Sequence, residues 1–195
     1  MSESLWNISG ASAAALAFSA CVLVNGVSAR LEGVNRPDLL PKEDTPLIDV
    51  AGFLTPGEED RLKLELRNME KDTGIKLRVL AQNYPETPGL AVKDFWAVDD
   101  DTVVMVADPG LGGNILNFNV GANVDLQIPR NFWSRLSGKY GNKFWWQEKG
   151  QEAAIVNAVS AIDTCFREPV GKLQCTKIQE PFDADDPKPK GLFGL

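Results

Sequence analysis

The feature that most constrains the fold is a helix with clear start and stop signals. Thr55–Glu58 has the sequence Thr-Pro-Gly-Glu, which supplies an N-cap threonine, a proline at the first helical position and the glutamate of a capping box. Leu62, Leu66 and Met69 then fall on one face, and Gly74 is typical of a helix end. Because a strand-like run precedes this helix and another follows it, the sequence predicts a βαβ unit and an α/β fold.

Two further runs predict a hairpin that joins the same sheet. The β-branched run before Asp108 predicts a buried central strand, and an alternating run follows the glycine-rich turn Asp108–Gly113. This turn lacks the Lys-Ser/Thr pair and the helix that a phosphate-binding loop requires, so we interpret it as a hairpin turn. The expected strands are Leu47–Val50, Ile75–Ala81, Thr102–Ala107 and Asn114–Val120, and the other expected helices are Leu90–Val98, Arg130–Lys139 and Glu148–Phe166.

The first 29 residues indicate export. They carry one charge, at Glu3, and end in Val27-Ser28-Ala29, with the small residues that a signal peptidase recognises at positions −3 and −1. An uncleaved membrane anchor is the alternative, since about 20 apolar residues can span a bilayer. A cleaved signal is favoured because Ala, Ser, Gly and Asn dominate the segment. Its start lacks basic residues, which we interpret as a sign that residues upstream of Met1 are missing.

Four segments are expected along the chain. They are an export signal (1–29), an extended Pro-rich arm (30–46), one α/β domain (47–167) and a C-terminal extension (168–195) whose last part is predicted to be disordered. The mature form is expected not to span a membrane. The net charge of −7 and the lack of a basic stripe argue against a nucleic-acid partner.

The absence of histidine restricts catalysis to other groups. No Ser-His-Asp or Cys-His triad can form, so any catalysis must use carboxylates, lysines, hydroxyls or a metal held by oxygen ligands. Asp49 and the triplet Asp99, Asp100 and Asp101 could supply oxygen ligands to Ca²⁺ or Mg²⁺, with Asp49 and Asp100 as catalytic candidates. Three interpretations of the triplet stay open: a solvated turn, a structural or regulatory cation site, and a catalytic metal site.

Cysteines and aromatic residues each leave two interpretations open. Cys165 and Cys175 could form a disulfide that pins the C-terminal segment onto the preceding helix, or could remain unlinked thiols. The densest aromatic cluster could pack as core or form a partner surface. Its members are Trp133, Tyr140, Trp145 and Trp146.

Several strings together resemble the TPM domain family over about residues 47–167. The capped helix ending at Gly74 belongs to this resemblance. The other strings are Asp49–Thr55, Lys76–Ala81 and Val103–Gly121, and those that resemble plant thylakoid-lumen members are Arg30–Asn35, Leu77–Pro85, Lys93–Trp96 and Asn114–Gly121. The turn Asp108–Gly113 departs from the charged loop expected of the family.

This resemblance implies a Rossmann-like α/β sandwich in which helices flank a mixed sheet with a β-hairpin. It also implies a location in the chloroplast thylakoid lumen, a link to photosystem II repair, and a weak acid phosphatase activity with a bound divalent cation. Two functions follow from it. We favour a non-catalytic binding or accessory module in photosystem assembly, maintenance or repair, because no nucleophile lies in an activating context. The alternative is a divalent-cation-dependent acid phosphatase of the lumen.

Overall fold

The computed structural model describes residues 34–110, 112–169, 171, 174–176 and 178. The predicted export signal and most of the predicted C-terminal extension lie outside these residues. All described elements belong to one unit, Gly33–Leu195. Within the described ranges, every helix is too short or too polar to cross a bilayer.

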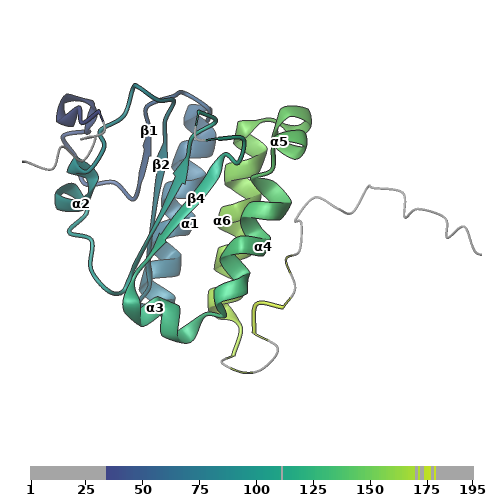
Figure 1. The fold of residues 1–195 in the computed structure, drawn as a ribbon. Helices are drawn as coiled ribbons and strands as arrows, with labels where there is room; N and C mark the ends of the chain where they lie inside the picture. Colours follow the sequence, from purple (N-terminus) through teal and green to yellow (C-terminus); the bar gives the residue numbers. More distant parts are fainter. Residues whose placement is uncertain (1–33, 111, 170, 172–173, 177, 179–195) are drawn as a thin grey trace, which may run out of the picture. The chain divides into compact units, whose positions relative to one another are not determined.

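A mixed four-stranded sheet forms the centre of this unit (Figure 1). The strands lie in the order β1 (Leu47–Asp49), β2 (Lys76–Ala81), β3 (Thr102–Ala107) and β4 (Leu116–Val120). The first three run parallel, and β4 pairs antiparallel with β3 as the second strand of the hairpin. The predicted α/β class and the predicted mixed sheet with a hairpin are therefore confirmed.

The capped helix, α1 (Pro56–Thr73), forms as its sequence predicts. The hydroxyl of Thr55 accepts from the backbone N–H of Glu58, and the Glu58 carboxylate accepts from the N–H of Thr55 at 2.8 Å. Gly74 ends the helix in the left-handed conformation, with φ of 76°. The other helices are η1 (Pro37–Leu39), α2 (Ala91–Phe95), α3 (Ala122–Gln127), α4 (Arg130–Tyr140), α5 (Lys143–Lys149) and α6 (Gln151–Arg167). The sequence did not predict α3 or α5, because neither is long enough to show an apolar period.

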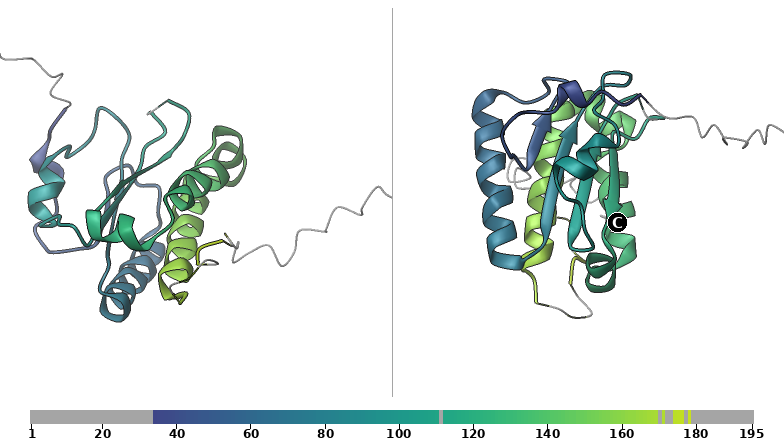
Figure 2. Two further views of the ribbon diagram at one scale, coloured as in Figure 1. Left: turned by 60° about the horizontal axis from the view of Figure 1, so that its bottom comes forward. Right: turned by 90° about the vertical axis from the view of Figure 1, so that its left-hand side faces the viewer.

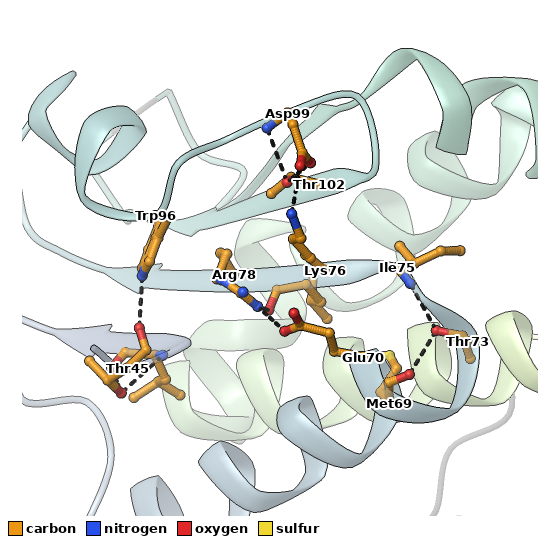
Figure 3. A network of polar contacts seen from close by, with 12 residues as sticks. Thr45, Met69, Glu70, Thr73, Ile75, Lys76, Arg78, Trp96, Asp99 and Thr102 are labelled. Carbon is orange, nitrogen blue, oxygen red and sulfur yellow. Dashed lines mark hydrogen bonds and ion pairs between the residues drawn. The ribbon is translucent and has the colours of Figure 1, made fainter. Parts of the chain in front are cut away.

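The two faces of the sheet are covered unequally. Helices α1, α4 and α6 cover one face and enclose the larger core, whereas α2 and η1 lie over the other (Figure 2). The smaller core on the side of α2 and η1 includes Leu40, which packs against the sheet. The indole N–H of Trp96 donates to the carbonyl of Thr45 at 2.7 Å (Figure 3). The arm before β1 is therefore not extended throughout, because it contains a short helix and contributes to a core.

Most of the aromatic cluster belongs to the core. Trp133 and Tyr140 are buried, which corrects their assignment to a partner surface, because their side chains fill the space between α4 and the sheet. Trp145 is half-buried, with its ring 5.3 Å from that of Tyr140, and Trp146 is also half-buried. The most exposed aromatic residue on α5 is Phe144.

A disulfide links Cys165, near the end of α6, to Cys175. The guanidinium of Arg135 on α4 donates to the carbonyls of Cys175 and Thr176. The described part of this C-terminal segment is thus held against both α6 and α4.

Candidate functional site

Three polar side chains lie at the carboxyl ends of the parallel strands. Asp49 is the last residue of β1, and Gln82 and Asp108 directly follow β2 and β3. Asp49 lies opposite Ala81, which lies opposite Ala107, so the three strands end at the same level of the sheet. Open α/β sheets bind ligands beyond this edge, which makes it the first place to examine for function.

Asp49 fixes the loop that leads into α1. Its Oδ1 accepts from the backbone N–H of Gly52 and its Oδ2 from that of Leu54, both at 2.8 Å. Gly52 has φ of 68°, a conformation that suits glycine. Asp49 is half-buried and lines a groove of about 340 Å³ together with Glu59 and Lys63, whose charged groups pair at 2.6 Å. This carboxylate therefore acts as a loop anchor at the border of an open groove.

Asp108 is the centre of a buried hydrogen-bond network. Its side chain has no exposed surface, its Oδ1 accepts from the N–H of Gly110 and its Oδ2 from the Gln82 side-chain amide, both at 2.8 Å. The side-chain carbonyl of Gln82 in turn accepts from the hydroxyl of Thr87. Sequence reasoning missed Gln82, Thr87 and the role of Asp108. The available signal was a polar residue directly after each of two buried strands.

The acidic triplet lies at the other end of β3. The Lys76 ammonium contacts Asp99 Oδ2 at 2.5 Å, and the Thr102 hydroxyl donates to Asp99 Oδ1 at 2.6 Å (Figure 3). The hydrogen bonds from Lys76 and Thr102 hold the pKa of Asp99 at about 2. Asp101 accepts from the side-chain amide of Asn123 at 2.9 Å. The triplet thus ties together the starts of β2, β3 and α3.

The structure does not bring Asp49 and the triplet together. Asp49 is level with Ala81, whereas Thr102, next to the triplet, is level with Lys76 at the opposite end of β2. Five residues of strand separate these levels, or about 16 Å at 3.3 Å per residue. The structure therefore corrects the prediction of a single cation site built from Asp49, Asp99, Asp100 and Asp101. Because the strands run parallel, the end of β1 and the start of β3 lie on opposite edges of the sheet.

The carboxyl edge does not present a ready set of cation ligands. Each carboxylate oxygen of Asp49 and Asp108 already accepts a hydrogen bond, and Asp108 is buried. Among the described residues, no group of three or more His, Cys, Asp or Glu side chains has the geometry to hold a metal ion. The donor set as folded does not fit Ca²⁺, which takes six to eight oxygens.

A Rossmann-like α/β sandwich with acidic residues at the carboxyl edge of its sheet is the class that this fold and site define. The chain belongs to the TPM domain family, whose model matches residues 47–165. This confirms the predicted family.

Known proteins extend the comparison. The chain is 68% identical over 147 residues to thylakoid lumenal 15.0 kDa protein 2, chloroplastic, of Arabidopsis thaliana. The match covers 75% of this chain and spans 66% of that relative's length. The predicted resemblance to a protein of the chloroplast thylakoid lumen is confirmed by this relative.

A solved structure is similar in fold. It is the solution structure of the N-terminal domain of a protein from P. gingivalis, with a TM-score of 0.54 and 16% sequence identity. The match covers 67% of this chain and 90% of that chain. At this level of identity the likeness shows the fold alone.

Proposed function

We propose that this protein is a TPM-domain protein of the chloroplast thylakoid lumen that acts as a non-catalytic binding or accessory module. Its role would lie in the assembly, maintenance or repair of a photosystem, with photosystem II as the partner complex. The lumenal location rests on the predicted export signal and on the name of the Arabidopsis relative. The observation that carries the non-catalytic role is the use of the carboxylates at the carboxyl edge to fix loops.

A carboxylate that acts as acid, base or nucleophile must reach its substrate. Asp108 is buried and bonded to Gly110 and Gln82, and both oxygens of Asp49 bind backbone N–H groups. These bonds hold the loops after β1, β2 and β3 in fixed positions. Rigid loops on a scaffold are the usual elements of a recognition surface, so the same bonds that tie up the carboxylates favour binding.

Tyr84 offers a way to test this surface. It is 52% exposed, and its Cβ lies 3.6 Å from where a Cβ on Gly110 would be, so it sits beside the loop after β3. Tagged protein would be incubated with solubilised thylakoid membranes and separated on native gels. We expect co-migration with photosystem II subunits that Tyr84→Ala weakens. Leu126→Ala, at an 85% exposed position on α3, is the matched control and should leave co-migration intact. Recovery of free protein alone would contradict the proposal.

The groove beside Asp49 is the observation that favours the alternative, a divalent-cation-dependent acid phosphatase. The groove has room for a small phosphate ester, and Lys63, which pairs with Glu59 at 2.6 Å, lies in its wall. Hydrolysis of p-nitrophenyl phosphate at acidic pH, with and without Ca²⁺ or Mg²⁺, tests this function. Loss of activity in Asp49→Asn, with activity kept in an Asp100→Ala, Asp101→Ala double variant, would support it. Equal background rates in all three proteins would exclude it.

A further inference from the structure

Helices α1 and α6 run parallel and in register. Near their ends, Arg167 of α6 contacts Asp72 of α1 at 2.7 Å, and near their starts the carboxyl groups of Glu58 and Glu152 are hydrogen-bonded to each other. At 1.5 Å per residue, these contacts are separated by about 21 Å along α1 and about 22 Å along α6. The two helices lie side by side in both views of Figure 2. Equal spacing along both helices makes this contact a continuous seam.

Acidic residues of α1 line this seam. Glu58, Glu65 and Asp72 are seven residues apart, which is almost two helical turns, so they lie on one side of the helix. Because the first and the third contact α6, Glu65 between them faces α6 as well. Glu65 is half-buried, and its carboxyl group is within electrostatic range of Asp163 on α6. Carboxylates from both helices therefore face one another along the seam.

Carboxylates outnumber cations in the seam. Two guanidinium groups serve it, those of Arg61 and Arg167. Arg167 already binds Asp72 at 2.7 Å and both oxygens of Asp163 at 2.9 Å. The five seam carboxylates are Glu58, Glu65, Asp72, Glu152 and Asp163. Among the residues that the structure describes, these five carboxylates therefore exceed the two guanidinium groups by three negative charges when all five are ionised.

Two charged groups on the flanking elements are bound to other partners. On α5, Glu148 pairs with Lys149 at 3.5 Å, and after α6 the carboxylate of Glu168 accepts from the backbone N–H of Cys175. The excess of negative charge therefore belongs to the seam itself.

The direction of the pKa shifts agrees with this geometry. Burial, followed by the charge of Asp163, raises the pKa of Glu65. The hydrogen bond with Glu58 raises the pKa of Glu152, while hydrogen bonds from Glu152 and Thr55 hold the pKa of Glu58 at about 2. The contact between Glu58 and Glu152 thus raises the pKa of one carboxyl group, while Glu58 accepts from the backbone N–H of Thr55 and caps α1.

We propose that the α1–α6 seam is a proton-binding latch, in which protons taken up at Glu65 and Glu152 remove like-charge repulsion and tighten the packing of α6 against α1. This property goes beyond the proposed function, because it concerns the packing of α6 against α1 and not the loops after β1, β2 and β3.

The sign of the effect follows from linkage. A glutamate whose pKa is raised by folding binds its proton more tightly in the folded than in the unfolded chain, where the ordinary value is 4.5. Stability therefore increases as the pH falls through the raised pKa values and levels off near 4.5. Below 4.5 the stabilising contribution of ionised Glu58 is lost as the pH falls toward its pKa of about 2. The contribution of the seam to stability is therefore largest at mildly acidic pH.

Urea unfolding of the full, disulfide-bonded chain from about pH 7.5 to about pH 4.5 tests the latch. We expect the midpoint to rise as the pH falls. A Glu65→Gln, Glu152→Gln double variant should have a higher midpoint than the unmodified protein at the neutral end and should lose most of the pH dependence. Glu43→Gln, at an exposed position in the arm, is the matched control and should follow the unmodified protein. A double variant that keeps the full pH dependence would overturn the proposal.

A second measurement does not depend on variants. Carbon NMR titration of the side-chain carboxyl groups of the unmodified protein reports the pKa of each glutamate directly. We expect Glu65 and Glu152 to titrate above the ordinary value of 4.5, with α6 amide protection from hydrogen exchange rising over the same pH range. Titration of both groups at or below 4.5 would overturn the latch even if the double variant failed to fold.

Discussion

The two ends of the sheet use aspartate in opposite ways. At the carboxyl end, Asp49 is half-buried and Asp108 fully buried, and both bind backbone or side-chain N–H groups inside the fold. At the amino end, Asp99, Asp100 and Asp101 are exposed, and Asp99 pairs with the ammonium of Lys76. Aspartates therefore hold loops together through buried or half-buried carboxylates at one end and through exposed carboxylates at the other.

This difference has an energetic consequence. Removing a buried acceptor leaves its donors unpaired away from water, which costs about 1–3 kcal/mol for each group. Removing one partner of an exposed ion pair costs about 0–1 kcal/mol, because water replaces the lost contact. The two ends should therefore respond to substitution with clearly different losses of stability.

The largest effect is expected at Asp108. Asp108→Ala removes the acceptor for the N–H of Gly110 and for the Gln82 amide, so the free energy of unfolding should fall by about 2–4 kcal/mol. Urea unfolding at neutral pH measures this change. Asp108→Asn retains one carbonyl acceptor and should lose less. A loss below about 0.5 kcal/mol in Asp108→Ala would show that the buried network does not stabilise the carboxyl end.

The next effect tests the backbone of the amino end. A Cβ on Gly121 would collide with the carbonyl oxygen of Asp100, so Gly121→Ala should destabilise by about 1–3 kcal/mol through displacement of the turn. Gly138→Ala is the matched control, because a Cβ there meets nothing within 4 Å and alanine favours the helix. Thermal unfolding of both variants distinguishes the two cases. Equal melting temperatures would mean that the turn leaves room for a Cβ between Gly121 and the carbonyl of Asp100.

A smaller effect is expected at Asp49. Asp49→Ala removes the acceptor for the N–H groups of Gly52 and Leu54, but the site borders a groove and water can reach it. The free energy of unfolding should therefore fall by about 1–2 kcal/mol, less than at Asp108. Urea midpoints of the two alanine variants measured side by side test this order. A larger loss of stability in Asp49→Ala than in Asp108→Ala would contradict the expectation that the buried network stabilises the fold more than the Asp49 hydrogen bonds do.

The smallest effect is expected for the exposed pair Lys76 and Asp99. Because folding lowers the pKa of Asp99 from 3.8 to about 2, its contribution is present above 3.8 and is lost as the pH falls toward 2. Lys76→Met should cost about 0.5 kcal/mol near neutral pH and close to nothing at the acidic end. Unfolding across this pH range in low and high salt measures it. A loss that salt does not reduce would contradict a surface ion pair.

Local sequence signals predicted the elements that carry their own start and stop. Helix α1 begins with a capping box and ends at Gly74, and both signals lie within the helix or next to it. The β-branched run of β3 and the alternating run of β4 predicted the hairpin in the same way. Helices α3 and α5 were missed because each is shorter than the window in which an apolar period becomes visible.

The candidate site was predicted less well, because it depends on strand direction. Because β1, β2 and β3 run parallel, Asp49 lies at one edge of the sheet and Asp101, the residue before Thr102, lies at the other. The predicted βαβ unit already implied parallel strands, so this separation was within reach of the sequence. The buried partnership of Gln82 with Asp108 was not, since the two positions are 26 residues apart in the sequence.

The sequence alone determined the α/β class, the family, the capped helix and the hairpin, because these rest on contacts between residues close in the chain or on strings that can be recognised directly. Only the tertiary structure decided which acidic residues meet. It buried Asp108, separated Asp49 from the triplet, and brought Glu58 against Glu152 across two parallel helices. The physical reason is that burial and charge depend on distances set by strand order and helix packing, which no short stretch of sequence encodes.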